Sequence, residues 1–304
     1  MNGSIQNLSK KQLWFAAIKP PMYSVAVIPV ILGTAIAYSE ILTINIFNFV
    51  LFLFSAIFII AWMNISNDVF DADTGIDKNK HHSIVNLTGN KNLMFWLSNL
   101  FLIMGLLGIA SISWMIQNWT IILLVFPACF LAYTYQGPPF RLGYKGLGEI
   151  ICFITFPTVV IASIYAQGAS LSDVGLAASI IIGISTALIL FCSHFHQIED
   201  DIAAGKTSPL VRLGTKKGYE VLKWITLSIF IIPTVFVILG YFPILTLLIF
   251  LSSPFAYKLI TYVGKYHDIP DKISSCKFIA VNLHFSSGIL LSLGFIISTL
   301  VISQ

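Results

Sequence analysis

Long apolar runs recur along almost the whole chain, and they constrain its fold more than any other feature. An α-helix needs about 20 apolar residues to cross a bilayer. Nine runs meet or approach this length, at residues 20–39, 46–65, 93–114, 119–135, 149–166, 174–193, 222–240, 243–261 and 278–301. Because 57% of the 304 residues are hydrophobic and 10% are charged, too little polar sequence remains for a separate soluble domain. We therefore predict an all-α polytopic membrane protein, one domain over residues 1–304, with nine transmembrane helices around a central cavity.

The basic residues indicate how these spans are oriented. All seventeen Lys and Arg lie before the first predicted span or near span ends that face the same side, and the four turns on the other side contain none. Cytoplasmic loops of membrane proteins are enriched in Lys and Arg. We therefore expect a multi-pass protein of a cell inner membrane or a thylakoid, with its N-terminus and polar loops on the cytoplasmic side. We also expect short helices in these loops, capping the cavity.

Two short acidic clusters follow the second and the sixth predicted span. They hold seven of the thirteen carboxylates of the chain: Asp68, Asp71, Asp73 and Asp77 in the first cluster, and Glu199, Asp200 and Asp201 in the second. Carboxylates beside a bilayer are costly unless a cation meets them. We expect both clusters at helix C-termini, where the helix dipole disfavours negative charge. Because Mg²⁺ prefers oxygen ligands and also binds phosphate oxygens, the clusters indicate a membrane enzyme that handles a diphosphate.

Helical spacing selects the candidate metal ligands. Residues at positions i, i+3, i+4 and i+7 share one face of a helix. The first cluster has this spacing at Asn64, Asn67, Asp68 and Asp71, and Asp77 would return after a turn at Gly75. In the second cluster, Gln197 and Asp201 are four residues apart, with Asp200 adjacent and Glu199 off that face. We expect two Mg²⁺ ions that bridge a diphosphate, one held by Asp68, Asp71 and Asp77 and the other by Asp201 with Glu199 or Asp200.

Basic and aromatic residues on the same side complete the predicted site. Because two metal ions only partly offset the charge of a diphosphate, basic side chains should converge on it. Taken singly, each lysine is better explained as a topology signal, and only the set beside two acidic clusters favours a role in binding. The tyrosine-rich loop 133–149 is either an interfacial aromatic belt or a lid whose rings face an allylic cation. The candidates are Lys206, Arg212, Arg141 and Tyr144 for catalysis, and Lys19, Lys78, Lys145 and Tyr135 for substrate binding.

Four histidines lie in or near the two clusters, at His81, His82, His194 and His196. Hard oxygen donors surround them, and no cysteine stands at metal-ligand spacing. We therefore expect polar contacts within the loops from these histidines rather than metal ligation.

The motif Asn67-Asp68-x-x-Asp71, with a second acidic motif after the sixth span, resembles the UbiA superfamily of intramembrane aromatic prenyltransferases. Asp77 follows Asp71 by six residues, as in the menaquinone and phylloquinone branch (MenA). The strings at 83–90, 135–149 and 194–214 look like those of its cyanobacterial and plastid members. Two positions depart from the family pattern. Bacterial members usually have Asp where this chain has Gln197, and the family often begins its first span with Arg-Pro where this chain has Lys19-Pro-Pro.

The resemblance implies a reaction and a set of partners. The donor would be phytyl diphosphate or another prenyl diphosphate, and the acceptor a carboxylated naphthoquinone or dihydroxynaphthoate. The prenyl group would replace the carboxyl group, with loss of CO₂ and pyrophosphate, on the way to phylloquinone. Mg²⁺ is the expected cofactor and membrane lipid the surroundings, and no nucleic acid is expected.

Three other activities stay open at this point. A menaquinone-type polyprenyltransferase and a homogentisate phytyltransferase would use similar motifs. An ion-coupled secondary transporter is the non-enzyme alternative, although it would place its acids near the middle of spans rather than at their ends.

Overall fold

The computed structural model describes residues 9–74, 76 and 83–302. Every regular element in these ranges is a helix. The predictions for Asp77, Lys78, His81 and His82 fall outside the described residues.

The apolar runs form the long helices of the bundle. These are α2 (Ser24–Ile41), α3 (Ile46–Thr74), α5 (Lys91–Met115), α7 (Gly148–Ala166), α8 (Asp173–His194), α10 (Pro209–Ile238) and α13 (Cys276–Ile302). The run at 243–261 forms the 3₁₀-helix η3 (Ile244–Ser252) followed by α11 (Ser253–Tyr266). Large apolar side chains such as Leu123, Trp224 and Ile238 are exposed, as lipid contact requires.

The predicted all-α membrane class is confirmed, whereas the count of nine spans stays a prediction. Eight helical segments among the described residues are long and apolar enough to cross a membrane. The remaining run forms α6 (Thr120–Gln136), which has 17 residues and an internal proline, Pro127. At 1.5 Å per residue, this helix is shorter than the usual hydrocarbon core.

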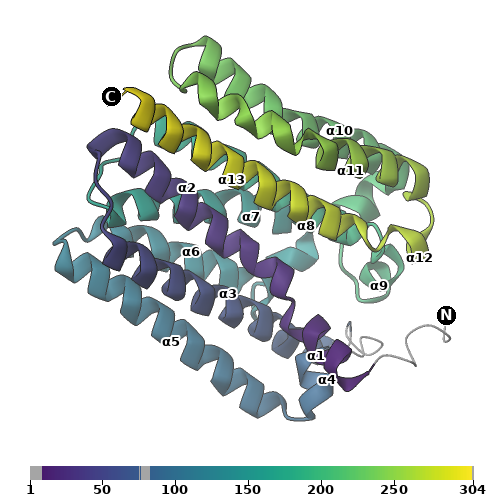
Figure 1. The fold of residues 1–304 in the computed structure, drawn as a ribbon. Helices are drawn as coiled ribbons and strands as arrows, with labels where there is room; N and C mark the ends of the chain where they lie inside the picture. Colours follow the sequence, from purple (N-terminus) through teal and green to yellow (C-terminus); the bar gives the residue numbers. More distant parts are fainter. Residues whose placement is uncertain (1–8, 75, 77–82, 303–304) are drawn as a thin grey trace.

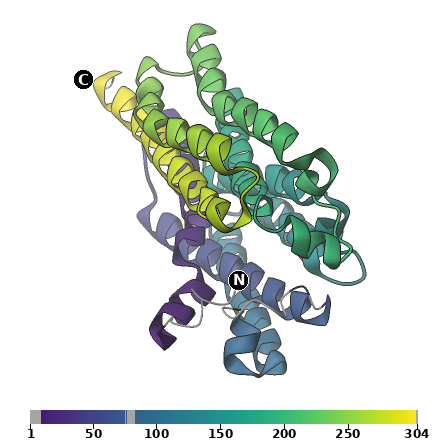
Figure 2. The same ribbon diagram turned by 90° about the vertical axis from the view of Figure 1, so that its right-hand side faces the viewer.

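Short helices gather at one end of the bundle (Figures 1 and 2). They are α1 (Lys10–Ile18), η1 (Pro20–Tyr23), α4 (Ile84–Thr88), η2 (Leu142–Lys145), α9 (Ile198–Ala203) and α12 (Pro270–Ile273). Each of the four loops predicted to be cytoplasmic contains one of them, so the expected loop helices are present. Which side of a membrane this end faces stays a prediction.

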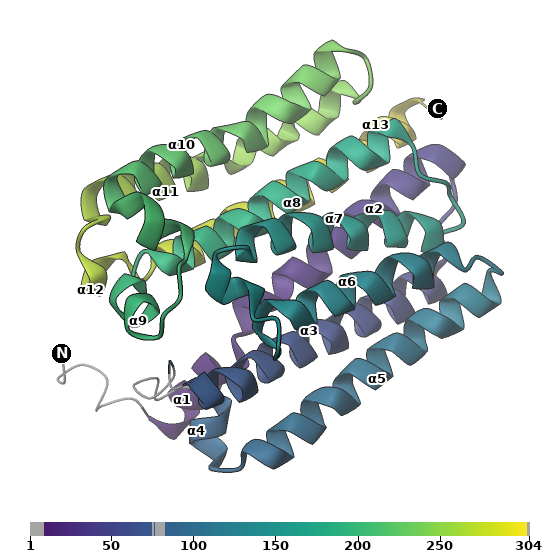
Figure 3. The same cartoon turned by 180° about the vertical axis from the view of Figure 1, so that it is seen from behind.

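Close packing of α2 on α7 shows how the helices are held near the centre of the bundle. A Cβ atom on Gly33 would lie 2.4 Å from the carbonyl oxygen of Val160, so only glycine permits this approach. Next to it, the Ser163 hydroxyl donates a hydrogen bond to the carbonyl oxygen of Val30 at 3.0 Å. Seen from behind, α6 and α7 lie between α3 and α8 (Figure 3), and neighbouring members of this series pack together. The ends of α3, α6, α7 and α8 that adjoin the two acidic clusters therefore lie side by side.

An apolar pocket lies among α2, α3, α5, α6 and α7. Its lining includes Met63 of α3, Ala132 of α6 and Phe156 of α7. Met63 precedes Asn64, and Ala132 lies one turn before Gln136, so the cavity borders the first acidic cluster.

Candidate active site

The first acidic cluster occupies the last turns of α3, as the helical spacing predicts. Asp68 is buried, with 1% of its surface exposed. Its Oδ1 accepts a hydrogen bond from Lys19 Nζ at 3.1 Å, and its Oδ2 accepts one from the backbone N–H of Ile84 at 2.9 Å. Lys19 adopts a left-handed backbone conformation between α1 and η1. This lysine, predicted to bind substrate, therefore lies against a predicted metal ligand.

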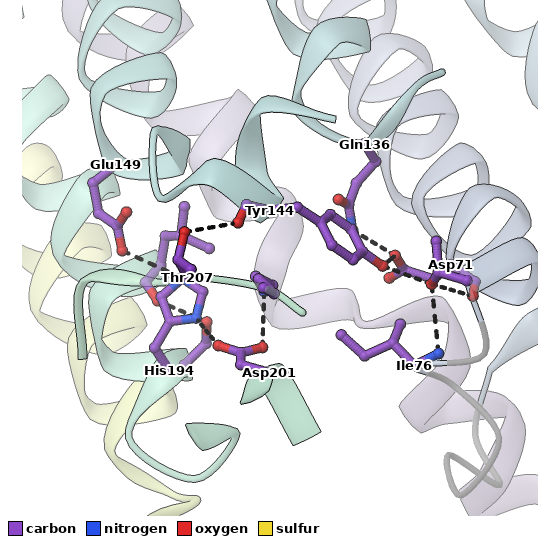
Figure 4. Close-up of polar contacts among 12 residues, drawn as sticks. Asp71, Ile76, Gln136, Tyr144, Glu149, His194, Asp201 and Thr207 are labelled. Atoms are coloured by element: carbon purple, nitrogen blue, oxygen red, sulfur yellow. Dashed lines mark hydrogen bonds and ion pairs between the residues drawn. The ribbon is translucent and has the colours of Figure 1, made fainter. Parts of the chain in front are cut away.

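Asp71 is also buried, and two side chains from beyond α3 contact it (Figure 4). Its Oδ1 accepts hydrogen bonds from Gln136 Nε2 at 2.7 Å and from the Tyr144 hydroxyl at 3.2 Å. The Tyr144 hydroxyl also lies 2.6 Å from Thr74 Oγ1. Burial, and then the charge of Asp71, raise the pKa of Tyr144 well above its ordinary value, so its hydroxyl keeps its proton. The sequence analysis did not single out Gln136 or Thr74.

The other polar residues of this cluster divide between the interior and the surface. Asn64 Nδ2 and Asn67 Oδ1 are buried, and neither has a hydrogen-bond partner among the described residues. Such atoms usually have a partner, so these two are available to a ligand. Asp73 is exposed and forms an ion pair with Lys91 on α5.

The second acidic cluster corrects one prediction. α8 ends at His194, and Gln197 is the N-cap of a separate short helix, α9. Glu199, Asp200 and Asp201 therefore lie in the first turn of a helix, where the dipole favours carboxylates, and not at a C-terminus. Three consecutive acids favour a helix start, which explains why α8 does not continue through them. The dipole argument for bound cations holds only for the first cluster.

Asp201 is the buried member of this cluster, whereas Glu199 and Asp200 are exposed. Its Oδ1 lies 3.1 Å from Lys206 Nζ, and its Oδ2 lies 3.2 Å from His194 Nδ1. Burial alone would raise the pKa of Asp201, but the hydrogen bond with His194 and the charge of Lys206 outweigh it and hold the pKa below its usual range. Asp201 is therefore a carboxylate at neutral pH.

The loop after α6 joins the two clusters through Tyr144. The hydroxyl of Tyr144 contacts Asp71, and its backbone carbonyl accepts a hydrogen bond from the backbone N–H of Thr207 at 2.8 Å (Figure 4). Arg212 reinforces this link, because its Nη2 donates to the carbonyl oxygen of Lys145 at 2.6 Å and its Nε donates to that of Thr207 at 3.2 Å. We call residues 142–146 the clasp loop.

The remaining predicted residues lie in the clasp loop or beside it. The ring of Tyr135 packs against Gly143 of the clasp loop and Gly148 at the start of α7. Arg141 is half-buried, and its Nε has no hydrogen-bond partner among the described residues. Lys145 is exposed, and its carbonyl, not its ammonium group, contacts Arg212.

The contacts of Arg212 yield a prediction that distinguishes two roles of this residue: supplying positive charge, and holding the clasp loop in place. Arg212→Lys keeps the positive charge but loses the planar fork that reaches two carbonyls. Hydrogen bonds to charged groups contribute about 1.5–3 kcal/mol each. We therefore expect both Arg212→Lys and Arg212→Ala to lower turnover by roughly 10- to 100-fold in membranes with equal protein content. Near-normal turnover of the Lys variant would show that only the charge matters.

A family comparison identifies the class of protein. The model of the UbiA prenyltransferase family matches residues 26–283. The chain belongs to the UbiA prenyltransferase family. The resemblance noted from the two motifs is thereby confirmed, including its menaquinone and phylloquinone branch.

Two relatives place this UbiA-family chain more closely. It is 57% identical to the 2-carboxy-1,4-naphthoquinone phytyltransferase of Synechocystis sp., over 94% of this chain and 93% of the relative. It is 41% identical to the chloroplastic 2-carboxy-1,4-naphthoquinone phytyltransferase of Arabidopsis thaliana, over 96% of this chain and 79% of that relative.

A solved structure shares the fold of the bundle. The UbiA homolog from Archaeoglobus fulgidus bound to DMAPP and Mg²⁺ superposes with a TM-score of 0.60 at 18% identity, over 92% of this chain and 99% of that chain. At this identity the likeness concerns the fold alone.

The donor set of this UbiA-family site suits a metal that binds together with its substrate. Among the described residues, no group of three or more His, Cys, Asp and Glu could enclose a metal ion. Asp68 and Asp71 lie on one side and Asp201 on the other, with the amide oxygen of Asn67 in addition. Mg²⁺ is usually held by one or two carboxylates together with substrate phosphates, so the residues present fit it.

Proposed function

We propose that this chain transfers a phytyl group from phytyl diphosphate to a carboxylated naphthoquinoid ring, as in phylloquinone biosynthesis. The observation that carries the proposal is 57% identity to the Synechocystis phytyltransferase along nearly the full length of both chains. The carbon–oxygen bond of the donor breaks, and its electron pair leaves with pyrophosphate. The acceptor ring forms a bond from its carboxyl-bearing carbon to the allylic cation. The carboxylate then leaves as CO₂, and its bonding pair restores the ring.

The two clusters are the proposed binding site for the diphosphate and two Mg²⁺ ions. Asn64, Asn67, Asp68 and Asp71 of α3 are the proposed ligands on one side, and Asp77, which lies outside the described residues, is a further proposed ligand. Asp201 of α9 is the proposed ligand on the other side, whereas the exposed positions of Glu199 and Asp200 favour them less, and Gln197 offers only a neutral oxygen. Mg²⁺, when bound, supplies positive charge that stabilises the departing pyrophosphate.

The basic residues and the apolar cavity have distinct proposed roles. Lys206 is buried beside Asp201, where its charge is little screened by water, so it is the strongest candidate to stabilise the leaving group. Arg141 is the second candidate, because its buried Nε has no partner among the described residues. The cavity that borders Asn64 and Gln136 is the proposed channel for the isoprenoid tail. The rings of Tyr135 and Tyr144 are the proposed contacts of the allylic cation, because a ring face attracts positive charge.

The proposed location is a cell inner membrane or a thylakoid, with the site end of the bundle on the cytoplasmic side. The one-sided distribution of Lys and Arg supports this orientation.

A substrate-pairing assay tests the function. Membranes from cells that express the chain are incubated with Mg²⁺ and with phytyl, geranylgeranyl or octaprenyl diphosphate. Each donor is paired with 2-carboxy-1,4-naphthoquinone, 1,4-dihydroxy-2-naphthoate or homogentisate. We expect the highest kcat/KM for phytyl diphosphate with a carboxylated naphthoquinoid, and one CO₂ released for each product formed. Preference for homogentisate or for octaprenyl diphosphate would contradict the proposal, and membranes without the chain serve as the blank.

A further inference from the structure

A row of four ionisable side chains, three of them buried and Glu149 partly exposed, runs through the second cluster and joins three helices (Figure 4). Glu149 of α7 lies 3.3 Å from His194 Nε2 at the end of α8, and Asp201 of α9 lies 3.2 Å from His194 Nδ1. Lys206, in the loop after α9, lies 3.1 Å from the other oxygen of Asp201. His194, Asp201 and Lys206 have exposed fractions of 2%, 1% and 5%. The proposed reaction makes no direct use of Glu149 or His194.

The position of Glu149 is costly for a residue that only supports the fold. Its Oε2 is buried and accepts no hydrogen bond among the described residues, and its one charged contact is His194. Burying carboxylate oxygens with so few partners is unfavourable, and the N-terminal turn of α7 offsets only part of this cost. Apolar residues of similar volume at these positions would be at least as stable.

The orientation of the Asp201 carboxylate depends on this row, because the other residues of its cluster provide no second buried carboxylate. Glu199 and Asp200 are exposed, and Gln197 carries no charge, so Asp201 is the one buried carboxylate that α9 provides. His194 occupies Oδ2 of Asp201, which leaves Oδ1 to Lys206 and to the site. The direction in which Oδ1 points is therefore set by the imidazole, and the imidazole is in turn held by Glu149 on its opposite nitrogen.

We propose that Glu149 and His194 are positioning residues for Asp201. His194 fixes the orientation of the Asp201 carboxylate, and Glu149 fixes the orientation of the His194 ring. This inference rests on the proposed function, because it concerns how Asp201 meets a diphosphate and its divalent cation. It also explains how a motif with Gln197 in place of an acid retains a well-oriented carboxylate.

The test measures Mg²⁺-dependent binding of phytyl diphosphate to the purified full chain in detergent, without acceptor. Groups that orient a metal ligand typically change metal affinity or activity by about 10- to 100-fold when removed. We expect Glu149→Ala and His194→Ala each to raise the Mg²⁺ concentration for half-maximal donor binding by about this factor. The KM for the acceptor should stay unchanged, because neither residue is proposed to contact it.

Three further variants distinguish positioning from simple loss of structure. His194→Asn keeps an N–H near the Nδ1 position, so it should recover most of the Mg²⁺ affinity, and Glu149→Ala should have no further effect in that background. Glu149→Gln keeps the volume and an acceptor oxygen, and it should bind with an intermediate Mg²⁺ requirement. The control His284→Asn alters another buried histidine, which lies on α13 and contacts Ser185 of α8, and it should leave the Mg²⁺ requirement unchanged. Thermal unfolding of each variant verifies the fold.

Two outcomes would overturn the inference. If folded Glu149→Ala and His194→Ala chains bind phytyl diphosphate at the wild-type Mg²⁺ requirement, the two residues do not position Asp201. If His194→Asn is as impaired as His194→Ala, the contact with Asp201 is not what matters. A wild-type chain that binds no phytyl diphosphate at any Mg²⁺ concentration would overturn the proposed function as well. Failure in the acceptor assay alone would leave this binding result standing.

Discussion

Asp71→Asn is expected to lower prenyl transfer by roughly 10³-fold or more, the largest effect of any single substitution we foresee. The change preserves the volume of the side chain but removes the charge that would hold a divalent cation. Metal-ion stabilisation of a leaving group is worth several kcal/mol, and each 1.4 kcal/mol corresponds to about a factor of ten in rate. Turnover in membranes with saturating phytyl diphosphate and Mg²⁺ measures the effect.

The matched control for Asp71→Asn lies two residues away in the same motif. Asp73 is exposed and paired with Lys91, and an exposed ion pair contributes about 0–1 kcal/mol. Asp73→Asn should therefore retain most of the activity. Equal losses in the two variants would mean that the motif acts through its overall charge and not through an inward-facing carboxylate.

Lys206→Met is the second prediction with a large effect, and it concerns both stability and rate. The substitution leaves Asp201 buried, with His194 as its remaining ion-pair partner among the described residues. Removing one member of a buried pair typically costs about 3–5 kcal/mol. We expect a clear fall in Tm of the detergent-solubilised chain, together with a loss of turnover of about 10²- to 10³-fold as stabilisation of the leaving group is lost.

A double substitution separates these two effects of Lys206. Lys206→Met with Asp201→Asn removes both charges and should recover much of the Tm but none of the turnover. Lys216→Met, at an exposed position on α10, is the control and should change neither quantity. A Lys206→Met chain with normal turnover would remove this lysine from the proposed mechanism.

Much of the fold and half of the site follow from local patterns in the sequence. Continuous apolar runs of about 20 residues become helices in a bilayer, because a helix satisfies its backbone groups within one segment. The spacing of Asp68 and Asp71 predicts one inward face, and both are buried while Asp73 is exposed. The periodicity of a continuous helix is what makes this part predictable.

The second cluster shows where local patterns fail. Because α8 ends before the three acids, they lie at the start of α9 and not at the end of α8. Helical periodicity cannot be applied across this break. Contacts such as Gln136 with Asp71 join residues 65 positions apart, so no local spacing reports them. The one-sided distribution of Lys and Arg predicted that Lys206 and Lys145 lie at the same end of the bundle. Only the tertiary packing makes Lys206 buried and Lys145 exposed.

The clasp loop contacts α3 and the segment after α9, and the two contacts differ in how easily a substitution would remove them. Tyr144 contacts Asp71 through its side chain, and many substitutions at that codon would abolish the contact. The Tyr144 carbonyl accepts two hydrogen bonds from Thr207, one from its hydroxyl at 3.2 Å and one from its backbone N–H at 2.8 Å. Every amino acid other than proline at 207 would preserve the second of these. Substitution of residue 144 during evolution can therefore change the contact with Asp71 on α3 while the backbone contact with Thr207 persists.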